Sequence, residues 1–453
     1  MAISFFADRS MTLARTLMLV LALGINITSA ISAPSLMTPG VAGNAARTRF
    51  DIKSAAMPIL LNRAALDNLQ RQDEFEFVLP NATRHMIVFD RIEDHGGGIR
   101  SSVGFLKDFG KDYRVIITTG PTGSFGSIRT PDTNYRIVPG QDGQDLLVDM
   151  TEEHKHIPFI DLGDDARRAP LAPNNGIEDE GLAVASTSSK VQGGESGILL
   201  STPTPQATVD LMIVYTKGLA TRLGAGLMTR LYNLVTAANT AYIDSEVAIT
   251  LRLVNATMVN YPDAPEGDGT ALDAITPSFG GGSGVFSNIE AIRNANGADL
   301  VSFLRNGSDF GGSGIAWLTT TATPNASFMY SVVTGCVIGC DSVFVHELGH
   351  NMGNAHDRAT AAYQEGGVAN PSAGAFPYSF GHFFCASGVL SCNPNVPPAS
   401  NGCVVQPECS TANVNNVGTI MSYFDPVTLK FSNPNLLCSQ PRVVLQIGDT
   451  AGL

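Results

Sequence analysis

One segment limits the folds open to this chain more than any other: His346-Glu347-Leu-Gly-His350-Asn-Met-Gly353-Asn-Ala-His356. Two histidines four residues apart project from one face of a helix, with Cβ atoms about 6 Å apart. Glycine at position 353 can adopt a positive φ and end that helix, so that the chain turns back and brings in the third histidine. The spacing therefore predicts a rigid helix, a tight turn and three imidazoles gathered at one point.

Three neutral nitrogen ligands leave one zinc position open for water, which is the catalytic rather than the structural pattern. We therefore predict that His346, His350 and His356 bind one catalytic Zn²⁺. Zinc lowers the pKa of a bound water from about 15.7 toward 7. Glu347 lies beside His346 on the same helix and is predicted to accept the proton of that water as a general base.

The residues around this segment favour a buried helix. Asp341 or Ser342 precedes the first apolar residues and is expected to cap the helix. Leu348 and Met352 provide apolar surface that can bury its remaining sides. A helix held in this way would keep the two histidines in a fixed geometry.

The extended motif resembles that of the metzincin zinc endopeptidases, in which a family-defining residue follows the third histidine. Here that residue is Asp357, as in the reprolysin (adamalysin) branch, and the lead-in from Cys340 looks most like the secreted bacterial members, including those called peptidyl-Asp metalloendopeptidases. The resemblance covers about residues 208–453. It implies an α/β (α+β) catalytic domain with a mixed, mostly parallel sheet, a zinc-binding helix and an irregular, disulfide-containing C-terminal part.

The resemblance also implies a methionine turn beneath the metal, and the string Gly418-Thr-Ile-Met421-Ser-Tyr423 fits it. Met421 is therefore expected to support the site. Tyr423 looks like the tyrosine of the Met-x-Tyr turn in astacins and serralysins, where it approaches the metal. Such a phenol can ligate the metal at rest or donate a hydrogen bond to the developing oxyanion. A tyrosine that only packs is the alternative.

Metzincins bind substrate as an antiparallel strand added to the edge strand that precedes the zinc helix. By resemblance, that edge is Gly314-Ile-Ala-Trp-Leu-Thr319, so Gly314, Ile315, Ala316 and Trp317 are expected to contact the peptide. The alternative is a strand that is buried on both faces.

Three regions differ in composition after the first thirty residues. Residues 31–163 alternate short β-like runs, such as 75–79 and 113–117, with Gly, Pro and Asp turns, which predicts a β-rich propeptide domain. Residues 164–207 are rich in Pro, Gly, Ser and Asn and predict an exposed processing linker. Residues 208–453 are predicted to form the catalytic domain.

No cysteine precedes Cys336, so a propeptide thiolate cannot silence the zinc. Asp161, Asp164 or a histidine from His154-Lys-His156 can substitute as the blocking ligand. The alternative interpretation is that all four residues are ordinary charged or polar residues of the surface.

Residues 1–30 predict an export signal, because Arg9 and Arg15 precede the apolar run 16–24 and small residues follow at Ser29-Ala30. That run has roughly ten uninterrupted apolar residues, against the ~20 that a membrane helix needs. We therefore expect a secreted protein without stable membrane insertion after signal removal. In that setting, disulfides are expected among the seven cysteines, all of which follow residue 335.

The charge balance excludes two classes of partner. With 41 acidic against 28 basic residues and a formal net charge of −13, a nucleic-acid surface or a polybasic membrane patch is improbable. The sequence predicts a secreted zinc-dependent endopeptidase, made as a proenzyme, that acts on protein or peptide substrates. The alternative is a secreted zinc-containing binding or adhesion protein on the same fold, which would be favoured if Glu347 were missing.

Overall fold

The computed structural model divides into two compact units, Met1–Pro34 and Ser35–Leu453. The predicted export signal lies outside the residues that the structure describes, as do the side chains of the five cysteines after Cys340. The described residues are 33–40, 56–140, 144–150, 165–171, 206–263, 267–307, 312–366, 368, 370–384, 391–392, 403–404, 417–423, 427–433, 436–440 and 443–447.

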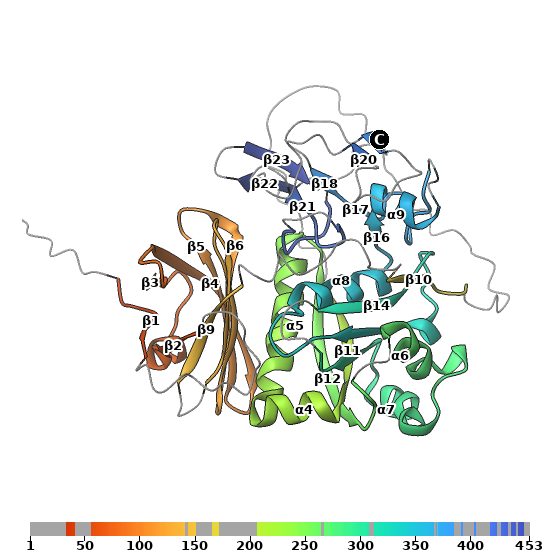
Figure 1. Cartoon of the computed structure of the whole chain (residues 1–453), viewed down its shortest axis with the longest axis horizontal. Helices are drawn as coiled ribbons and strands as arrows, with labels where there is room; N and C mark the ends of the chain where they lie inside the picture. Colours follow the sequence, from red (N-terminus) through yellow and green to blue (C-terminus); the bar gives the residue numbers. More distant parts are fainter. Residues whose placement is uncertain are drawn as a thin grey trace, which may run out of the picture. The chain divides into compact units, whose positions relative to one another are not determined.

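A nine-stranded antiparallel sheet is built from residues 37 to 149 (Figure 1), in the order β1-β2-β9-β8-β7-β6-β5-β4-β3. A bridge between Ser35 and Glu76 joins the segment before β1 to β3, so the sheet closes on itself. Alternate residues such as Phe75 and Phe77 enter one buried core. The strands are β1 Met37–Pro39, β2 Ala56–Leu61, β3 Glu74–Val78, β4 Arg84–Gly96, β5 Ile99–Leu106, β6 Gly110–Gly120, β7 Gly123–Arg129, β8 Asn134–Pro139 and β9 Asp145–Asp149, and the short helix α2 is Arg63–Asp67.

The second large sheet has six strands in the order β10-β14-β15-β13-β11-β12. Four of its neighbouring pairs are parallel, and only β14 and β15 are antiparallel. This is the mixed, mostly parallel sheet that was expected, although antiparallel pairs predominate over the described chain because of the nine-stranded sheet. The strands are β10 Ala166–Arg168, β11 Ala207–Thr216, β12 Ile249–Val259, β13 Leu300–Arg305, β14 Ser313–Leu318 and β15 Tyr330–Thr334.

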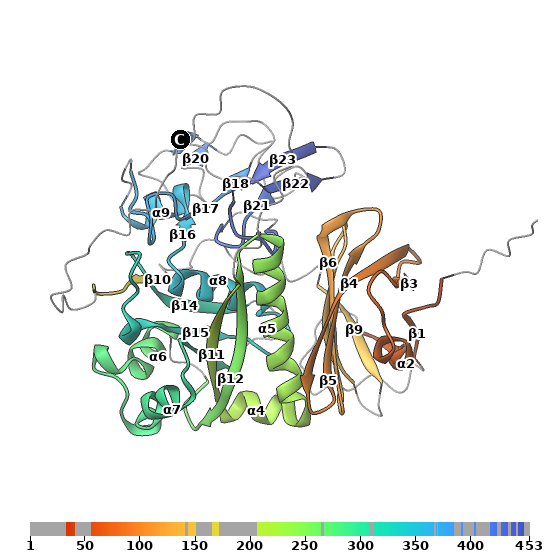
Figure 2. The ribbon, with the colours of Figure 1, turned by 180° about the vertical axis from the view of Figure 1, so that it is seen from behind.

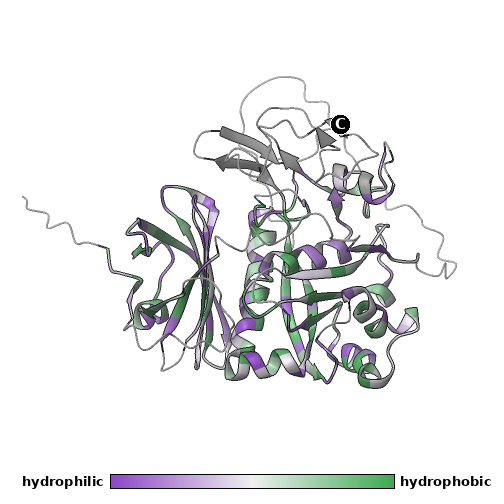
Figure 3. Cartoon of the chain, viewed as in Figure 1, coloured by the Kyte–Doolittle hydropathy of each residue, from purple (hydrophilic) through white to green (hydrophobic). Residues whose placement is uncertain are grey.

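Helices cover both faces of this sheet. In β11, Leu211 and Ile213 join one core while Met212 and Val214 join another, as expected for a strand that is buried on both sides. Figure 2 shows α5 running alongside β12, and Figure 3 shows a mixture of hydrophobic and hydrophilic residues along α5. The helices are α4 Lys217–Leu223, α5 Leu227–Asp244, α6 Asp268–Ile275, α7 Ile289–Asn296, α8 Asp341–Asn351 and α9 Arg358–Gln364, with 3-10 turns η1 Gly224–Gly226, η2 Pro277–Phe279, η3 Gly284–Phe286 and η4 Ala326–Phe328.

The part after α8 has short strands only. They pair as β16 Ala355–Asp357 with β17 Phe380–Gly381, β18 Phe383–Phe384 with β21 Val417–Gly418, β19 Ser391–Cys392 with β20 Cys403–Val404, and β22 Leu436–Gln440 with β23 Val443–Ile447. Among the described residues, no helix is both long and apolar enough to span a bilayer.

The zinc-motif helix α8 begins differently from the prediction. Its N-cap residue is Cys340, which forms a disulfide with Cys336, and no side chain caps the helix. Asp341 is the first helical residue, so neither it nor Ser342 is the cap. Instead, the Asp341 carboxylate accepts from Arg230 at 2.8 Å and lies 3.1 Å from Arg136. An arginine pair on that carboxylate stabilises it more strongly than the backbone amides of the first turn would.

The predicted exposed linker is wrong at its first residues. Ala166–Arg168 form β10, which pairs in parallel with Ala316–Leu318 of β14. The amide of Ala316 donates to the carbonyl of Asp165 at 2.8 Å, and the amide of Ala169 donates to Leu318 at 2.9 Å. A polar stretch can still dock where a sheet edge offers unpaired backbone groups. Residues 172–205 lie outside the description.

Candidate metal centre and active site

Each of the three predicted histidines has its Nδ1 held by an oxygen of the chain. The contacts are His346 to Ile420 O at 2.7 Å, His350 to Asn354 O at 2.7 Å and His356 to Gln364 Oε1 at 2.6 Å. An oxygen acceptor requires the proton on Nδ1, so each Nε2 presents a lone pair to the shared centre. The second contact shell therefore orients all three rings as metal ligands.

With the proton of each ring on Nδ1, the three Nε2 atoms can together bind a cation. His350 Nε2 and His356 Nε2 lie 3.1 Å apart, and with both protons on Nδ1 neither nitrogen can donate to the other. Two ligands on a tetrahedral zinc with Zn–N near 2.0–2.1 Å would be separated by about 3.3 Å. Nε2 of His346 is buried and has no hydrogen-bond partner among the described residues. The residues present therefore fit a bound metal ion.

The turn after α8 delivers the third histidine as the spacing predicted. Gly353 has φ +89°, and a Cβ there would lie 2.5 Å from Ala375 Cβ, so a larger residue fits neither the backbone nor the space. The amide of Asn354 donates back to Gly349 O at 2.9 Å. The chain then enters β16, which carries His356.

Asp357 connects the turn after α8 to the turn at Met421 by hydrogen bonds. Its backbone amide donates to Met421 O at 3.2 Å, and its carboxylate accepts from Ser422 Oγ at 3.2 Å and from Thr360 Oγ1 at 2.7 Å. Because Ile420 O also holds His346, the two turns are linked to the ligands directly. Aspartate at this position thus has a clear physical role.

Met421 is buried at 1 % exposure next to the zinc-motif helix. A Cβ on Gly349 would lie 2.5 Å from Met421 Sδ and 2.8 Å from Phe431, so only glycine allows this approach. The sulfur therefore packs directly against the turn of α8 that separates His346 from His350. Met421 thus lies against the ligand-bearing turn of α8, and its supporting role stays a prediction.

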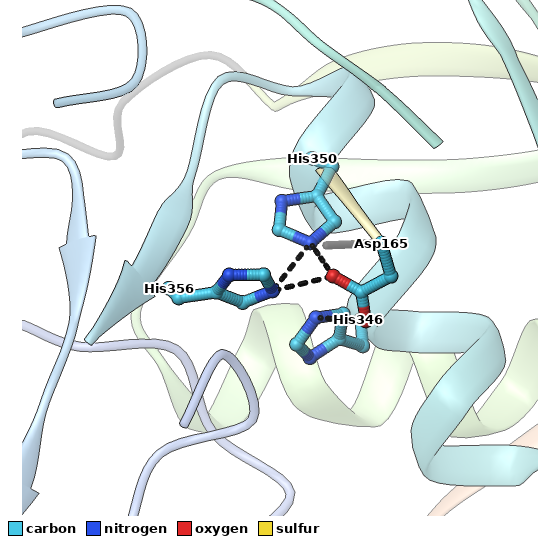
Figure 4. A group of neighbouring side chains, drawn as sticks. All are labelled: Asp165, His346, His350 and His356. Atoms are coloured by element: carbon cyan, nitrogen blue, oxygen red, sulfur yellow. Dashed lines mark hydrogen bonds and ion pairs between the residues drawn. The ribbon is translucent and has the colours of Figure 1, made fainter. Parts of the chain in front are cut away.

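A fourth group, which the sequence did not identify, completes the cluster. The Asp165 carboxylate lies 2.6 Å from His356 Nε2, 3.3 Å from His350 Nε2 and 3.6 Å from His346 Nε2, as Figure 4 shows. The ligand atoms of all four residues lie within 4.8 Å of one another. A carboxylate facing three nitrogen lone pairs is stable only around positive charge, which a metal ion or added protons must supply.

Burial and the contacts between Asp165 and the histidines determine the pKa values in this cluster. Burial would raise the pKa of Asp165, but His356 and His346 outweigh burial and hold it well below its usual range. Burial lowers the pKa of His350 to about 4. Burial also lowers the pKa of His356, but Asp165 outweighs it and the net shift is upward.

Glu347 lies on α8 with no exposed surface. Neither carboxylate oxygen has a hydrogen-bond partner in the described part of the chain. Burial raises the pKa of this carboxyl well above its usual range, and the nearby Asp165 and Asp268 carboxylates raise it further. Gly314 of β14 lies against it, since a Cβ there would collide with Glu347 Oε1 and lie 2.7 Å from its Cδ.

The other predicted residues divide into near and distant groups. The Tyr423 ring lies 4.5 Å from the His356 ring, centroid to centroid, so this side chain borders the metal centre. Ile315 and Ala316 lie on β14 beside β10. Trp317 is on the same strand, but its indole N–H donates to Thr276 Oγ1 at 2.9 Å and its ring packs in a core rather than at the centre.

Sequence reasoning missed Asp165 and Gln364. The four blocking candidates that it offered (His154, His156, Asp161 and Asp164) lie outside the described residues. Nothing in the sequence distinguished Asp165 from the neighbouring Asp161 and Asp164, which precede the same basic pair. Gln364 had no signal either, because an acceptor for Nδ1 can come from almost any polar residue or carbonyl.

Three histidines gathered beside a sheet-packed helix, next to a buried carboxylate, form the arrangement that the zinc-peptidase motif is expected to give. Residues 205–424 match metallo-peptidase family M12, and residues 42–153 match the BamI lipocalin-like domain. Residues 205–424 are thus similar to the metallopeptidases of family M12.

Relatives with this domain are named peptidyl-Asp metalloendopeptidase. One, from Stenotrophomonas maltophilia, is 25% identical over 268 residues, which is 59% of this chain and 54% of the relative. Another, from Xanthomonas campestris pv. campestris, is 25% identical over 277 residues, 59% of this chain and 55% of the relative. The chain thus spans about half the length of these relatives. A crystal structure of metalloproteinase-II from Bacteroides fragilis is 12% identical with a TM-score of 0.40, covering 66% of this chain and 86% of that one.

Proposed function

We propose that the protein is a secreted, zinc-dependent endopeptidase that is made as a proenzyme. The observation that carries this proposal is the convergence of three Nε2 lone pairs, each fixed by a contact at the opposite ring nitrogen, beside a buried carboxylate without a partner among the described residues. A structural metal site keeps four protein ligands and needs no base, whereas here the fourth group, Asp165, belongs to the segment that we propose is removed.

The chain supplies four functions around the metal. His346, His350 and His356 hold the ion, which when bound acidifies a water and polarises a carbonyl. Glu347 accepts the proton of the attacking water and delivers it to the leaving amine. The Tyr423 hydroxyl donates to the oxygen that develops negative charge.

Internal bonds are the expected target because the edge of β14 beside the histidines binds the middle of a chain. Residues 165–169 lie along this edge, with chain continuing at both ends. A pocket that recognised a terminus would need a group to bind a free amine or carboxylate. The edge of β14 instead offers main-chain hydrogen bonds to any extended peptide, including Ala316 N–H and Leu318 O.

Asp165 supports the proenzyme part of the proposal. Its carboxylate faces all three histidine Nε2 atoms and would take the place of a water on a bound ion, and β10 takes the strand position that a substrate would need. β10 runs parallel to β14, whereas a metzincin substrate is expected to run antiparallel. The segment therefore blocks the centre in a direction unsuited to cleavage, and removing it would open both positions together.

The contact between the nine-stranded sheet and α5 also fits a removable domain. This contact combines apolar packing, such as that of Ala237 with Val103 and Ile116, with polar side chains spaced three or four residues apart along the helix. Asn233 donates to Thr118 at 3.1 Å, and Thr236 donates to Glu93 at 2.9 Å. Thr240 accepts from Arg91 at 2.6 Å, and Asp244 accepts from Arg114 at 2.6 Å. Water can replace the partners of these polar side chains after the sheet departs.

Hydrolysis of a denatured protein by the secreted, processed form tests the proposal. We expect cleavage to stop with a chelator and return with zinc. Glu347→Gln should keep the metal and lose hydrolysis, because it removes the proton acceptor and no ligand. His356→Ala should lose both, since one of only three protein ligands is gone. A Glu347→Gln protein within tenfold of wild-type activity would contradict the mechanism, and cleavage unaffected by chelation would contradict the metal.

A further inference from the structure

The strand β10, which pairs with the edge of β14, places two arginines in two separate guanidinium sites. Arg167 and Arg168 are successive residues of β10, so their side chains point to opposite sides of the strand. Figures 1 and 2 show α6 and α9 on opposite sides of β10 and β14. Each arginine reaches a carboxylate on its own side: Asp273 of α6 and Glu365, directly after α9.

The site for Arg168 is shaped for a guanidinium. Nη2 donates to Glu365 Oε1 at 2.7 Å and to Ser372 O at 3.0 Å, and Nη1 donates to Ala373 O at 3.2 Å. The Glu365 carboxylate is already fixed, because both its oxygens accept from the Ser372 amide at 3.0 Å. One carboxylate and two carbonyls around a planar fork match arginine better than the point charge of lysine.

The site for Arg167 is built on glycine. Asp273 and Gly269 lie four residues apart on α6 and so share one face of the helix. A Cβ at position 269 would lie 2.7 Å from Arg167 Nη2, so the missing side chain leaves the space that the guanidinium occupies. Asp273 pairs with that guanidinium.

The Glu365 site is also tied to the metal centre. Gln364, the residue before Glu365, accepts from His356 Nδ1 at 2.6 Å. The contact that orients the His356 ring therefore also sets the position of the Glu365 carboxylate relative to the three histidines. A side chain bound at Glu365 is held in fixed register with the metal.

We propose that these two sites remain when β10 leaves and that they select substrates with basic side chains, arginine above all, at adjacent positions along β14. This inference rests on the proposed endopeptidase function. A peptide antiparallel to β14 that presents its scissile bond to the metal would place the residues opposite Trp317 and Leu318 on the amino-terminal side of that bond. Basic residues are thus expected within a few positions before the cleaved bond.

The processed protein obtained from the full chain provides the first test. After digestion of a denatured proteome, we expect arginine to be enriched at two adjacent positions before the cleaved bonds. On matched quenched peptides, replacing either arginine with glutamine should lower kcat/KM about 3- to 10-fold, as suits partly exposed ion pairs. Glu365→Gln and Asp273→Asn should each erase the preference at one position only, while Glu290→Gln, on exposed α7, should change neither. Cleavage with no basic enrichment, or with acidic enrichment there, would overturn the inference and leave the endopeptidase standing.

A binding measurement separates the inference from catalysis. A fluorescent peptide with the sequence of residues 165–171 is titrated into processed Glu347→Gln protein, together with versions that carry Gln or Lys in place of each arginine. We expect weaker binding of the Gln versions by about 3- to 10-fold and a smaller loss for Lys in place of Arg168. The Glu365→Gln change should weaken binding of the parent peptide but not of the version in which glutamine replaces Arg168. Equal binding of all peptides would refute the two sites, even in a protein that hydrolyses nothing.

Discussion

Replacing Asp165 with alanine should activate the full-length chain without any cleavage. The carboxylate has two contacts at or below 3.3 Å, to His356 and His350, and its side chain is only 15 % exposed. Contacts that involve a charged group contribute about 1.5–3 kcal/mol each. Removing both therefore costs the closed state about 3 kcal/mol at the lower bound.

That free energy sets the expected activity. At about 1.4 kcal/mol per tenfold, the open population should rise on the order of 100-fold. The backbone hydrogen bonds of β10 to Ala316 and Leu318 remain in the variant, so the chain should stay below the rate of the processed protein. The variant is thus expected to be partly, not fully, active.

The assay is the initial rate of hydrolysis of a quenched peptide by intact full-length protein, with its mass recorded before and after. Asp164→Ala is the matched control, because it removes the neighbouring carboxylate and leaves Asp165 in place. An Asp165→Ala/Glu347→Gln double variant shows whether any activity comes from the chain itself. A basal rate within threefold of wild type for Asp165→Ala, in a preparation whose processed form is active, would refute the blocking role. Activation by Asp164→Ala instead would transfer that role to the neighbour.

Three further substitutions test other parts of the site. Gly314→Ala should lower kcat about 10- to 100-fold with metal content unchanged, because its Cβ displaces the Glu347 carboxylate; normal kcat would contradict this contact. Tyr423→Phe should lower kcat and kcat/KM together by about 10- to 1000-fold if the hydroxyl binds the oxyanion, and hardly at all if the ring only packs. Arg136 and Arg230 outweigh burial and lower the pKa of Asp341, so its contribution is present above the unfolded pKa of about 3.9 and lost as pH falls through the folded value. Asp341→Asn should therefore lower stability by about 3 kcal/mol at pH 7, with a difference in Tm that shrinks near pH 3.

The ligands and their helix could be predicted because short covalent spacing determines them. The four-residue spacing of His346 and His350 fixes a shared helix face, and Gly353 permits the one backbone conformation that returns His356 to it. The strands of the nine-stranded sheet were predictable for a similar local reason, since alternation such as that of Phe75 and Phe77 reports a two-residue period.

Asp165 could not be found in this way because its role depends on contacts far along the chain. Its partners begin at His346, and β10 exists only because β14 has a free edge to pair with. The segment has no periodicity of its own, so local composition favoured a linker. The same limit applies to Gly349. Local propensity makes glycine unfavourable in a helix, and only its contact with the distant Met421 explains why this position has no side chain.

The two ways in which the front of the chain contacts the metallopeptidase domain have different consequences for activation. In the proposed proenzyme, Asp165 and β10 lie at the three histidines and along the edge of β14, so their removal would be needed for activity. The sheet contact on α5 is distant from the ligands, and its Arg114–Asp244 pair is almost fully buried, with 2% and 1% exposure. Cutting the chain after β10 would leave that contact intact, and a buried pair of this kind separates slowly unless water reaches it. The proposed activation therefore has two steps, cleavage and release, and only the departure of β10 from β14 would free the position that a substrate takes.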